Sequence, residues 1–151
     1  MLFRSATVVS AARSANALMP SKAVEMLSNQ LDGLDGKSVA VLGISYRGGV
    51  KEAAFSGVFP TVSSLLSKGA KVFVHDPMYS DDEIIKYGFT PFKIGNQIDA
   101  IVIQADHKEY RELSQADFPG LQAVTDGRRI LNPNKFADIN FRVIGAPASA
   151  K

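Results

Sequence analysis

The sequence predicts an α/β fold: a Rossmann-like, open, mostly parallel sheet of five to six strands with helices on both faces, preceded by an N-terminal helix. Short apolar runs alternate with helix-like segments along the chain, which is the pattern of βαβ units. Residues 100–103 are continuously apolar, as expected of a strand buried on both faces. A glycine-rich stretch, residues 43–56, lies between the first strand and the next helix, where open α/β sheets bind phosphorylated ligands.

The N-terminal region can be interpreted in two ways. Residues 1–24 contain three basic residues, several serines and no acid before Glu25, which is the composition of an organellar transit peptide. Apolar residues at mostly helical spacing favour a helix instead. Pro20 is expected to break this helix, which restarts over residues 21–30. We expect no cleavable signal peptide, because the apolar stretch after Arg4 is short and mixed.

Turn and capping residues delimit the other elements. Two Asp-Gly pairs end the first helix, and Gly69 takes the C-cap role after the second. Ser80, followed by three acids, is a helix start, and Pro91 restricts its strand to a sheet edge. The expected strands are residues 37–42, 71–75, 89–92, 100–103, 122–125 and 141–144, and the expected helices are 58–68, 81–87 and 107–113.

With six strands, the expected order is 3-2-1-4-5-6 with right-handed crossovers. The turn after Leu42 then lies at the switch point of the sheet, where ligands bind. We expect an N-terminal helical segment at 1–36, a nucleotide-binding domain at 37–146 and a frayed tail at 147–151.

Composition narrows the function. The chain has 151 residues, enough for one domain with a real core, and is 46% apolar and 21% charged. A net charge of +2 gives no basic face for nucleic acid or a membrane surface, and no apolar run approaches the roughly 20 residues of a membrane span. The absence of cysteine excludes disulfides, thiolate metal sites and a thiol nucleophile, and is typical of a cytoplasmic protein.

Two motifs place arginines at the carboxyl edge of the predicted sheet. The first turn is not the Gly-x-Gly-x-x-Gly fingerprint, because Ser45 stands at the second glycine. Tyr46 and Arg47 instead offer an aromatic face and a guanidinium that can fork onto phosphate, or they are a half-buried ring beside a solvated cation. Arg128 follows the strand at 122–125, so an anion pocket between the two sites is plausible. A turn with exposed arginines is the alternative.

No metal centre or catalytic acid–base pair is expected. His75-Asp76 and Asp106-His107 lie at strand ends, but no third ligand has suitable spacing. Asp106 is explained as the cap of the following helix, and Asp76 as a turn initiator before Pro77.

These motifs together resemble the C-terminal domain of the UDP-glucose/GDP-mannose dehydrogenase family. The similarity covers nearly the whole chain in order. Its motif residues are Arg13, Asn16, Met19 and Pro20 in the first helix; Leu42, Gly43, Tyr46, Arg47, Glu52 and Ser56 around the first turn; Asp76 and Pro77; and Asp126, Gly127 and Arg128. The form of residues 46–52 looks most like the UDP-N-acetyl-mannosamine branch.

The resemblance implies an NAD-dependent oxidation of a UDP-sugar primary alcohol to a carboxylate. In the family, an N-terminal domain binds NAD, and a central region carries the catalytic cysteine and mediates dimerisation, here expected through the N-terminal helix. By position, Tyr46, Arg47 and Arg128 are implied to contact the UDP-sugar. Ala54 replaces the family arginine near the cofactor, so no tight NAD binding and no catalysis are expected of this chain alone.

Two other functional classes stay open beside this one. The first is a stand-alone regulatory module that binds a nucleotide or NAD without catalysis. The second is a response-regulator-like domain, which is disfavoured because the first strand has no acidic pair at its end.

Overall fold

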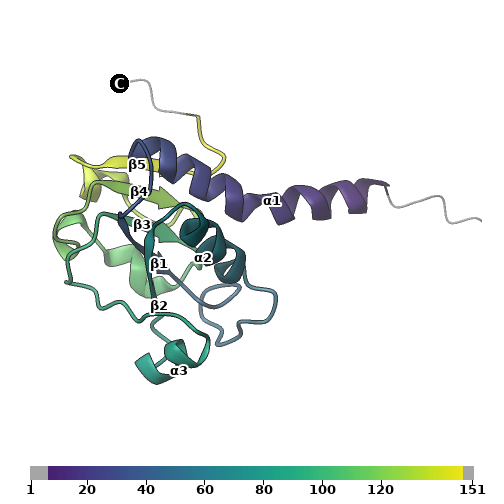
Figure 1. Cartoon of the computed structure of the whole chain (residues 1–151), viewed down its shortest axis with the longest axis horizontal. Helices are drawn as coiled ribbons and strands as arrows, with labels where there is room; N and C mark the ends of the chain where they lie inside the picture. Colours follow the sequence, from purple (N-terminus) through teal and green to yellow (C-terminus); the bar gives the residue numbers. More distant parts are fainter. Residues whose placement is uncertain (1–6, 148–151) are drawn as a thin grey trace, which may run out of the picture.

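A computed structural model of the chain describes residues 7–147 (Figure 1). Its sheet has five parallel strands in the order β2-β1-β3-β4-β5. The elements in chain order are α1 (Thr7–Gln30), β1 (Ser38–Leu42), α2 (Val58–Ser67), β2 (Lys71–His75), α3 (Asp81–Lys86), β3 (Ala100–Ile103), η1 (Lys108–Glu112), η2 (Gln115–Asp117), β4 (Ala123–Asp126), η3 (Pro133–Phe136) and β5 (Asn140–Val143), where η marks a 3-10 helix.

The predicted strand order is confirmed, with the third strand reduced to a single bridge. Pro91 pairs with Val74 on the outer side of β2, and no longer strand forms there among the described residues. Proline has no N–H to donate to a ladder, which limits this segment to one edge contact. Counting that segment as the third strand, the observed order is 3-2-1-4-5-6.

Alternate residues of the strands enter two separate cores, one on each face of the sheet. Val39, Val41 and Val102 pack with α1, α2 and Ile84 of α3. Their neighbours Ala40, Leu42 and Ile101 point to the opposite face. That second face is covered by the short 3-10 helices and their loops rather than by α-helices, and its largest side chains are Tyr110, Phe118 and Phe136.

Helix α1 is continuous, so the prediction that Pro20 breaks it was wrong. The second half of the helix is fixed to the domain, since Val24 and Leu27 are buried and the Gln30 side chain bonds to Thr125 Oγ1 at 2.7 Å. The first half is exposed and projects beyond the sheet, as its purple end in Figure 1 shows. Proline removes one i→i−4 bond, which would be accepted by the carbonyl of Asn16. Asn16 is exposed, so water can solvate that carbonyl and the helix can continue.

The helix expected at 107–113 is a 3-10 helix, η1, with His107 as its N-cap. Asp106 does not cap it: no side chain does, and the Asp106 carboxylate accepts a hydrogen bond from the Gly48 N–H instead. By contrast, α3 begins as predicted. Ser80 and Glu83 form a reciprocal capping box, and three acids occupy the first turn.

Between residues 7 and 147, no helix is long and apolar enough to cross a membrane. The first six residues of the predicted N-terminal segment and residues 148–151 of the predicted tail lie outside the described residues. The domain boundary predicted between residues 36 and 37 stays a prediction.

Candidate functional site

The carboxyl edge of the sheet carries the site, and Gly43 shapes its first turn. Gly43 directly follows β1 and has a φ of 111°. A Cβ at this position would stand 2.4 Å from the Ala105 Cβ, so both the conformation and the space require glycine. The chain leaves β1 close against the end of β3, and the following loop turns out over the edge of the sheet.

Two aspartates at the ends of β2 and β3, the strands on either side of β1, hold this loop. The Asp76 Oδ2, at the end of β2, accepts from the Ile44 N–H at 2.7 Å and the Ser45 N–H at 3.2 Å. Asp106 Oδ1 accepts from the Gly48 N–H at 2.7 Å. At Gly48 a Cβ would lie 2.2 Å from the Asp106 carbonyl oxygen, so the loop approaches the β3 end as closely as glycine permits. Ser45 is fully buried beneath this turn rather than facing a ligand.

Arg128 joins the loop to the ends of β3 and β4. Its Nε donates to the Gln104 carbonyl at 2.7 Å, and its Nη2 donates to the Tyr46 carbonyl at 3.1 Å. These bonds use two of the five guanidinium N–H groups and leave the positive charge at the edge of the sheet. The side chain is exposed. Arg128 therefore positions the Tyr46 backbone and presents a cation beside it.

A buried carboxylate fixes the turn that carries Arg128. Asp126, at the end of β4, is completely inaccessible to solvent. Its Oδ1 accepts from the N–H groups of Arg128 and Arg129, at 2.9 and 2.8 Å. Its Oδ2 accepts from those of Ile130 and Leu131, both at 2.9 Å. Four backbone donors to one carboxylate fix the conformation of this turn. The sequence analysis had not distinguished it from a surface turn with exposed arginines.

Arg47 lies against Tyr46. Its Nε donates to the Tyr46 hydroxyl at 3.2 Å, and its guanidinium carbon lies 5.8 Å from the ring centroid, within cation–π range. Both side chains are exposed. The structure thus brings both arginines to Tyr46, Arg47 at its ring and Arg128 at its carbonyl.

A groove of about 690 Å³ runs along this edge. Its walls come from the middle of α1 (residues 16–23), the loop after β1, the start of α2 and the ends of β3 and β4. Tyr46 and Arg128 are among the lining residues, whereas Arg47 is not. The others are Asn16, Ala17, Met19, Pro20, Ala23, Phe55, Ser56, Gly57, Pro60, Val102, Ile103, Gln104, Gly127 and Ile144.

Sequence analysis missed several of these groups. Phe55 has a positive φ of 59° and a fully exposed ring, although an aromatic residue rarely adopts that conformation. Gly57 begins α2 at the groove, and a Cβ there would lie 2.6 Å from Gln104 Nε2. The α2 N-terminus brings the positive end of a helix dipole to the groove. Phe55 lies in the stretch 43–56 that the sequence singled out and Gly57 directly follows it, but no pattern indicated that α1 would form a wall of the groove.

Beneath the loop, Asp76 and His107 form a buried pair. His107 Nε2 lies 3.0 Å from Asp76 Oδ2, and both side chains are almost fully buried. Burial alone would raise the pKa of Asp76. Hydrogen bonds from His107, Met78 and Ile44 outweigh burial and lower the pKa. Asp76 does start the turn before Met78, as predicted, since Oδ1 accepts from the Met78 N–H at 2.9 Å. No cluster of three or more metal-ligating side chains occurs in residues 7–147.

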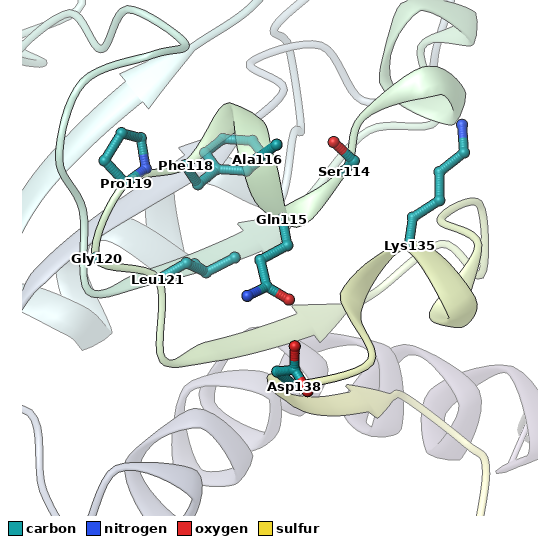
Figure 2. Close-up of a pocket in the computed structure, with 9 residues that line it drawn as sticks. All are labelled: Ser114, Gln115, Ala116, Phe118, Pro119, Gly120, Leu121, Lys135 and Asp138. Carbon is teal, nitrogen blue, oxygen red and sulfur yellow. The ribbon is translucent and has the colours of Figure 1, made fainter.

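A second groove, of about 530 Å³, lies away from this edge (Figure 2). It is formed around η2, the loop before β4 and the turn after η3. Leu121, one of its lining residues, lies two positions before β4, so the groove is near the amino end of that strand. Its charged groups are Lys135 and Asp138, of opposite sign. The Lys135 Nζ already pairs with Glu112 at 3.1 Å. This groove offers no cluster of cations to a nucleotide.

A family model and individual relatives place the chain in the same protein family. Residues 40–133 match the model of the UDP-glucose/GDP-mannose dehydrogenase family, UDP binding domain. The chain is 29% identical over 146 residues to UDP-glucose 6-dehydrogenase of Rickettsia bellii, covering 89% of this chain and 34% of that protein. It is 27% identical over 154 residues to UDP-N-acetyl-D-mannosamine dehydrogenase of Methanocaldococcus jannaschii, covering 93% and 34%.

Solved structures agree with the fold. A UDP-glucose dehydrogenase from Pyrobaculum islandicum superposes with a TM-score of 0.75 at 26% identity, covering 91% of this chain and 32% of that one. A UDP-D-ManNAc dehydrogenase from Pyrococcus horikoshii gives 0.75 at 24% identity, covering 95% and 34%. The chain spans about a third of the length of the proteins it matches.

Proposed function

Since the chain belongs to the UDP-glucose/GDP-mannose dehydrogenase family, we propose that it binds the nucleotide part of a UDP-sugar for an NAD-dependent 6-dehydrogenase. The enzyme oxidises the sugar's primary alcohol to the carboxylate of a uronate. The proposed sugar is N-acetyl-mannosamine or glucose, as in the names of the two relatives described above.

The observation that carries this proposal is the groove at the carboxyl edge with Arg128 and Tyr46 on its wall. Its volume of about 690 Å³ is within the range of small-molecule sites. The switch between β1 and β3 is where open α/β sheets bind nucleotides. Arg128 supplies charge for a diphosphate, the α2 N-terminus adds a positive dipole end, and Tyr46 offers a ring on which a base or ribose can stack.

Arg47 is the second phosphate ligand in this proposal. It is exposed and held only by the Tyr46 side chain among its described hydrogen bonds. A guanidinium on a flexible stem can swing toward a bound diphosphate and fork onto it. Tyr46, Arg47 and Arg128 are therefore the proposed substrate-binding residues, and none of them is assigned a catalytic role.

The catalytic chemistry is proposed to come from other parts of the enzyme, an NAD-binding domain and a central region with the nucleophilic cysteine. This chain has no cysteine, so it cannot form a thiohemiacetal with the substrate. Incubated with UDP-sugars and NAD, it should produce no NADH above the blank. The exposed apolar residues of the first half of α1, among them Val8, Val9 and Leu18, are proposed to pack in a cytoplasmic homodimer.

The experiment is a calorimetric titration of the chain with UDP, UDP-N-acetyl-mannosamine, GDP-mannose and NAD. Binding of the uridine nucleotides above the others supports the proposal. Arg47→Ala should weaken UDP binding by about 1.5–3 kcal/mol, the range for hydrogen bonds to charged groups, and added salt should weaken it further. Arg111→Ala is the matched control, an exposed arginine on η1. Preference for NAD over UDP would instead favour a cofactor-binding regulatory module.

A further inference from the structure

His107 lies where it can control the loop that carries Tyr46 and Arg47. Its side chain is 1% exposed and occupies the space between the end of β2 and the loop. Nε2 lies 3.0 Å from Asp76 Oδ2, and Nδ1 accepts the Gly49 N–H at 3.3 Å. Gly49 itself has a φ of 74°, so this turn adopts a conformation that few residues other than glycine hold. His107 thus adds a second connection between the end of β2 and the loop, beside the direct bonds from Ile44 and Ser45 to Asp76.

These contacts define the tautomer of His107. A backbone N–H can only donate, so Nδ1 must be the unprotonated nitrogen that accepts it. The ring proton then sits on Nε2 and donates to the Asp76 carboxylate. Asp76 in turn accepts from Ile44 and Ser45 at the start of the same loop. One neutral imidazole therefore joins the Gly48–Gly49 side of the loop to the carboxylate that holds its first residues.

Protonation of His107 would remove the hydrogen bond from the Gly49 N–H to Nδ1. A proton on Nδ1 would face the Gly49 N–H, placing two donors against each other in a partly buried site. The titratable groups around the ring come from each adjoining element: His75 and Asp76 at the end of β2, Asp106 before η1, and Tyr110 of η1, whose ring centroid is 5.5 Å away. The Asp76 charge would hold the imidazolium in place. The two facing donors can therefore separate only if the loop moves.

We propose that His107 is a positioning residue for nucleotide binding, which in its neutral Nε2–H form holds the Gly48–Gly49 turn and so orients Tyr46 and Arg47. When His107 is protonated, the turn is released and nucleotide affinity falls. The effect on affinity rests on the proposed function of the groove, whereas the release of the loop rests on the hydrogen bonds alone.

Two amide variants separate the two nitrogens. In His107→Asn, the carbonyl oxygen of the side chain can replace Nδ1 as acceptor for Gly49, but it cannot be protonated near neutral pH. In His107→Gln, the amide can replace the Nε2–H donor to Asp76 and the acceptor for Gly49 is lost. His75→Gln is a control at the same strand end, since the His75 side chain bonds to Tyr110 rather than to the loop.

The first measurement is the hydrogen-exchange protection of the Gly49 amide by NMR, corrected for the intrinsic effect of pH. We expect His107→Gln to lower the protection by about 3- to 10-fold, the range that one hydrogen bond supplies, while His107→Asn and His75→Gln leave it near the wild-type value. In the wild type, the protection should fall as the imidazole nitrogen shifts report protonation of His107. Equal protection in all four proteins, or wild-type protection unchanged across that titration, would overturn the proposal.

The second measurement is UDP affinity against pH for the wild type and His107→Asn. The phosphate of UDP also titrates, but it does so identically for both proteins, so the ratio of their affinities isolates His107. We expect this ratio to fall by about 3- to 10-fold as His107 protonates. A constant ratio would refute the link to nucleotide binding. If the wild type does not bind UDP at any pH, the proposed function fails, and the exchange data still decide whether His107 holds the loop. If the variants do not fold, the wild-type exchange titration decides alone.

Discussion

Asp126→Asn is the perturbation that most sharply separates the Arg128 turn from an ordinary surface turn. Asn keeps one carbonyl oxygen, which can serve two of the four backbone donors that now share the carboxylate. The other two N–H groups would meet the amide NH₂, itself a donor. Losing two hydrogen bonds to a charged group costs about 3–6 kcal/mol. Relief from burying the charge offsets part of this loss, so we expect a value near the lower end.

Urea unfolding followed by circular dichroism measures this change, because a single domain of this size is expected to unfold in one transition. The isosteric control is Asp138→Asn, an exposed aspartate after η3 that should stay within about 0.5 kcal/mol of the wild type. UDP affinity should fall in Asp126→Asn as well, since Arg128 is attached to the turn. A loss of stability below about 1 kcal/mol would show that the carboxylate does not organise the turn, and the reasoning about Arg128 would fail with it.

Two further predictions concern stability. Ile101→Ala, in the middle of β3 and fully buried, should lower the free energy of unfolding by about 2–5 kcal/mol, and an unchanged melting temperature would mean that β3 is not central. Folding lowers the pKa of three aspartates from the usual 3.8, namely Asp76, Asp99 and Asp106, and lowers the pKa of Glu83 from 4.5 to about 2. The stability that these carboxylates contribute is fully present above the unfolded-state pKa values and is lost as pH falls through the folded-state values. Urea midpoints should therefore drop between pH 4.5 and pH 2, and a flat profile over that interval would contradict the assigned hydrogen bonds.

The strands were the most predictable part of the molecule. Two strands, Lys71–His75 and Ala100–Ile103, match the predicted bounds residue for residue, because short apolar runs are delimited by Asp-Pro and by polar segments. Ser80 and its acids predicted α3 for a similarly local reason. Local patterns failed at Pro20, where solvent exposure rather than propensity decides whether a helix can continue.

The groove was only half predictable. Tyr46 and Arg128 follow strand ends whose shared edge is a consequence of parallel topology, so the sequence could place both there. The contact of Asp76 with His107 joins residues 31 positions apart through a loop path that no periodicity encodes. The same holds for Asp106, whose expected role as a cap was replaced by a bond to Gly48 across the edge of the sheet. Close backbone approach at Gly43 and Gly48 determines these partners, and it is visible only in three dimensions.

A crystal structure of the chain with UDP tests the central claim most directly. We expect the diphosphate between Arg47 and Arg128 at the carboxyl edge of the sheet, with Tyr46 against the uridine and the groove along α1 occupied. UDP bound instead in the groove between Ser114 and Asp138, or the guanidinium groups of Arg47 and Arg128 directed to opposite sides of the domain with no nucleotide between them, would contradict the assignment.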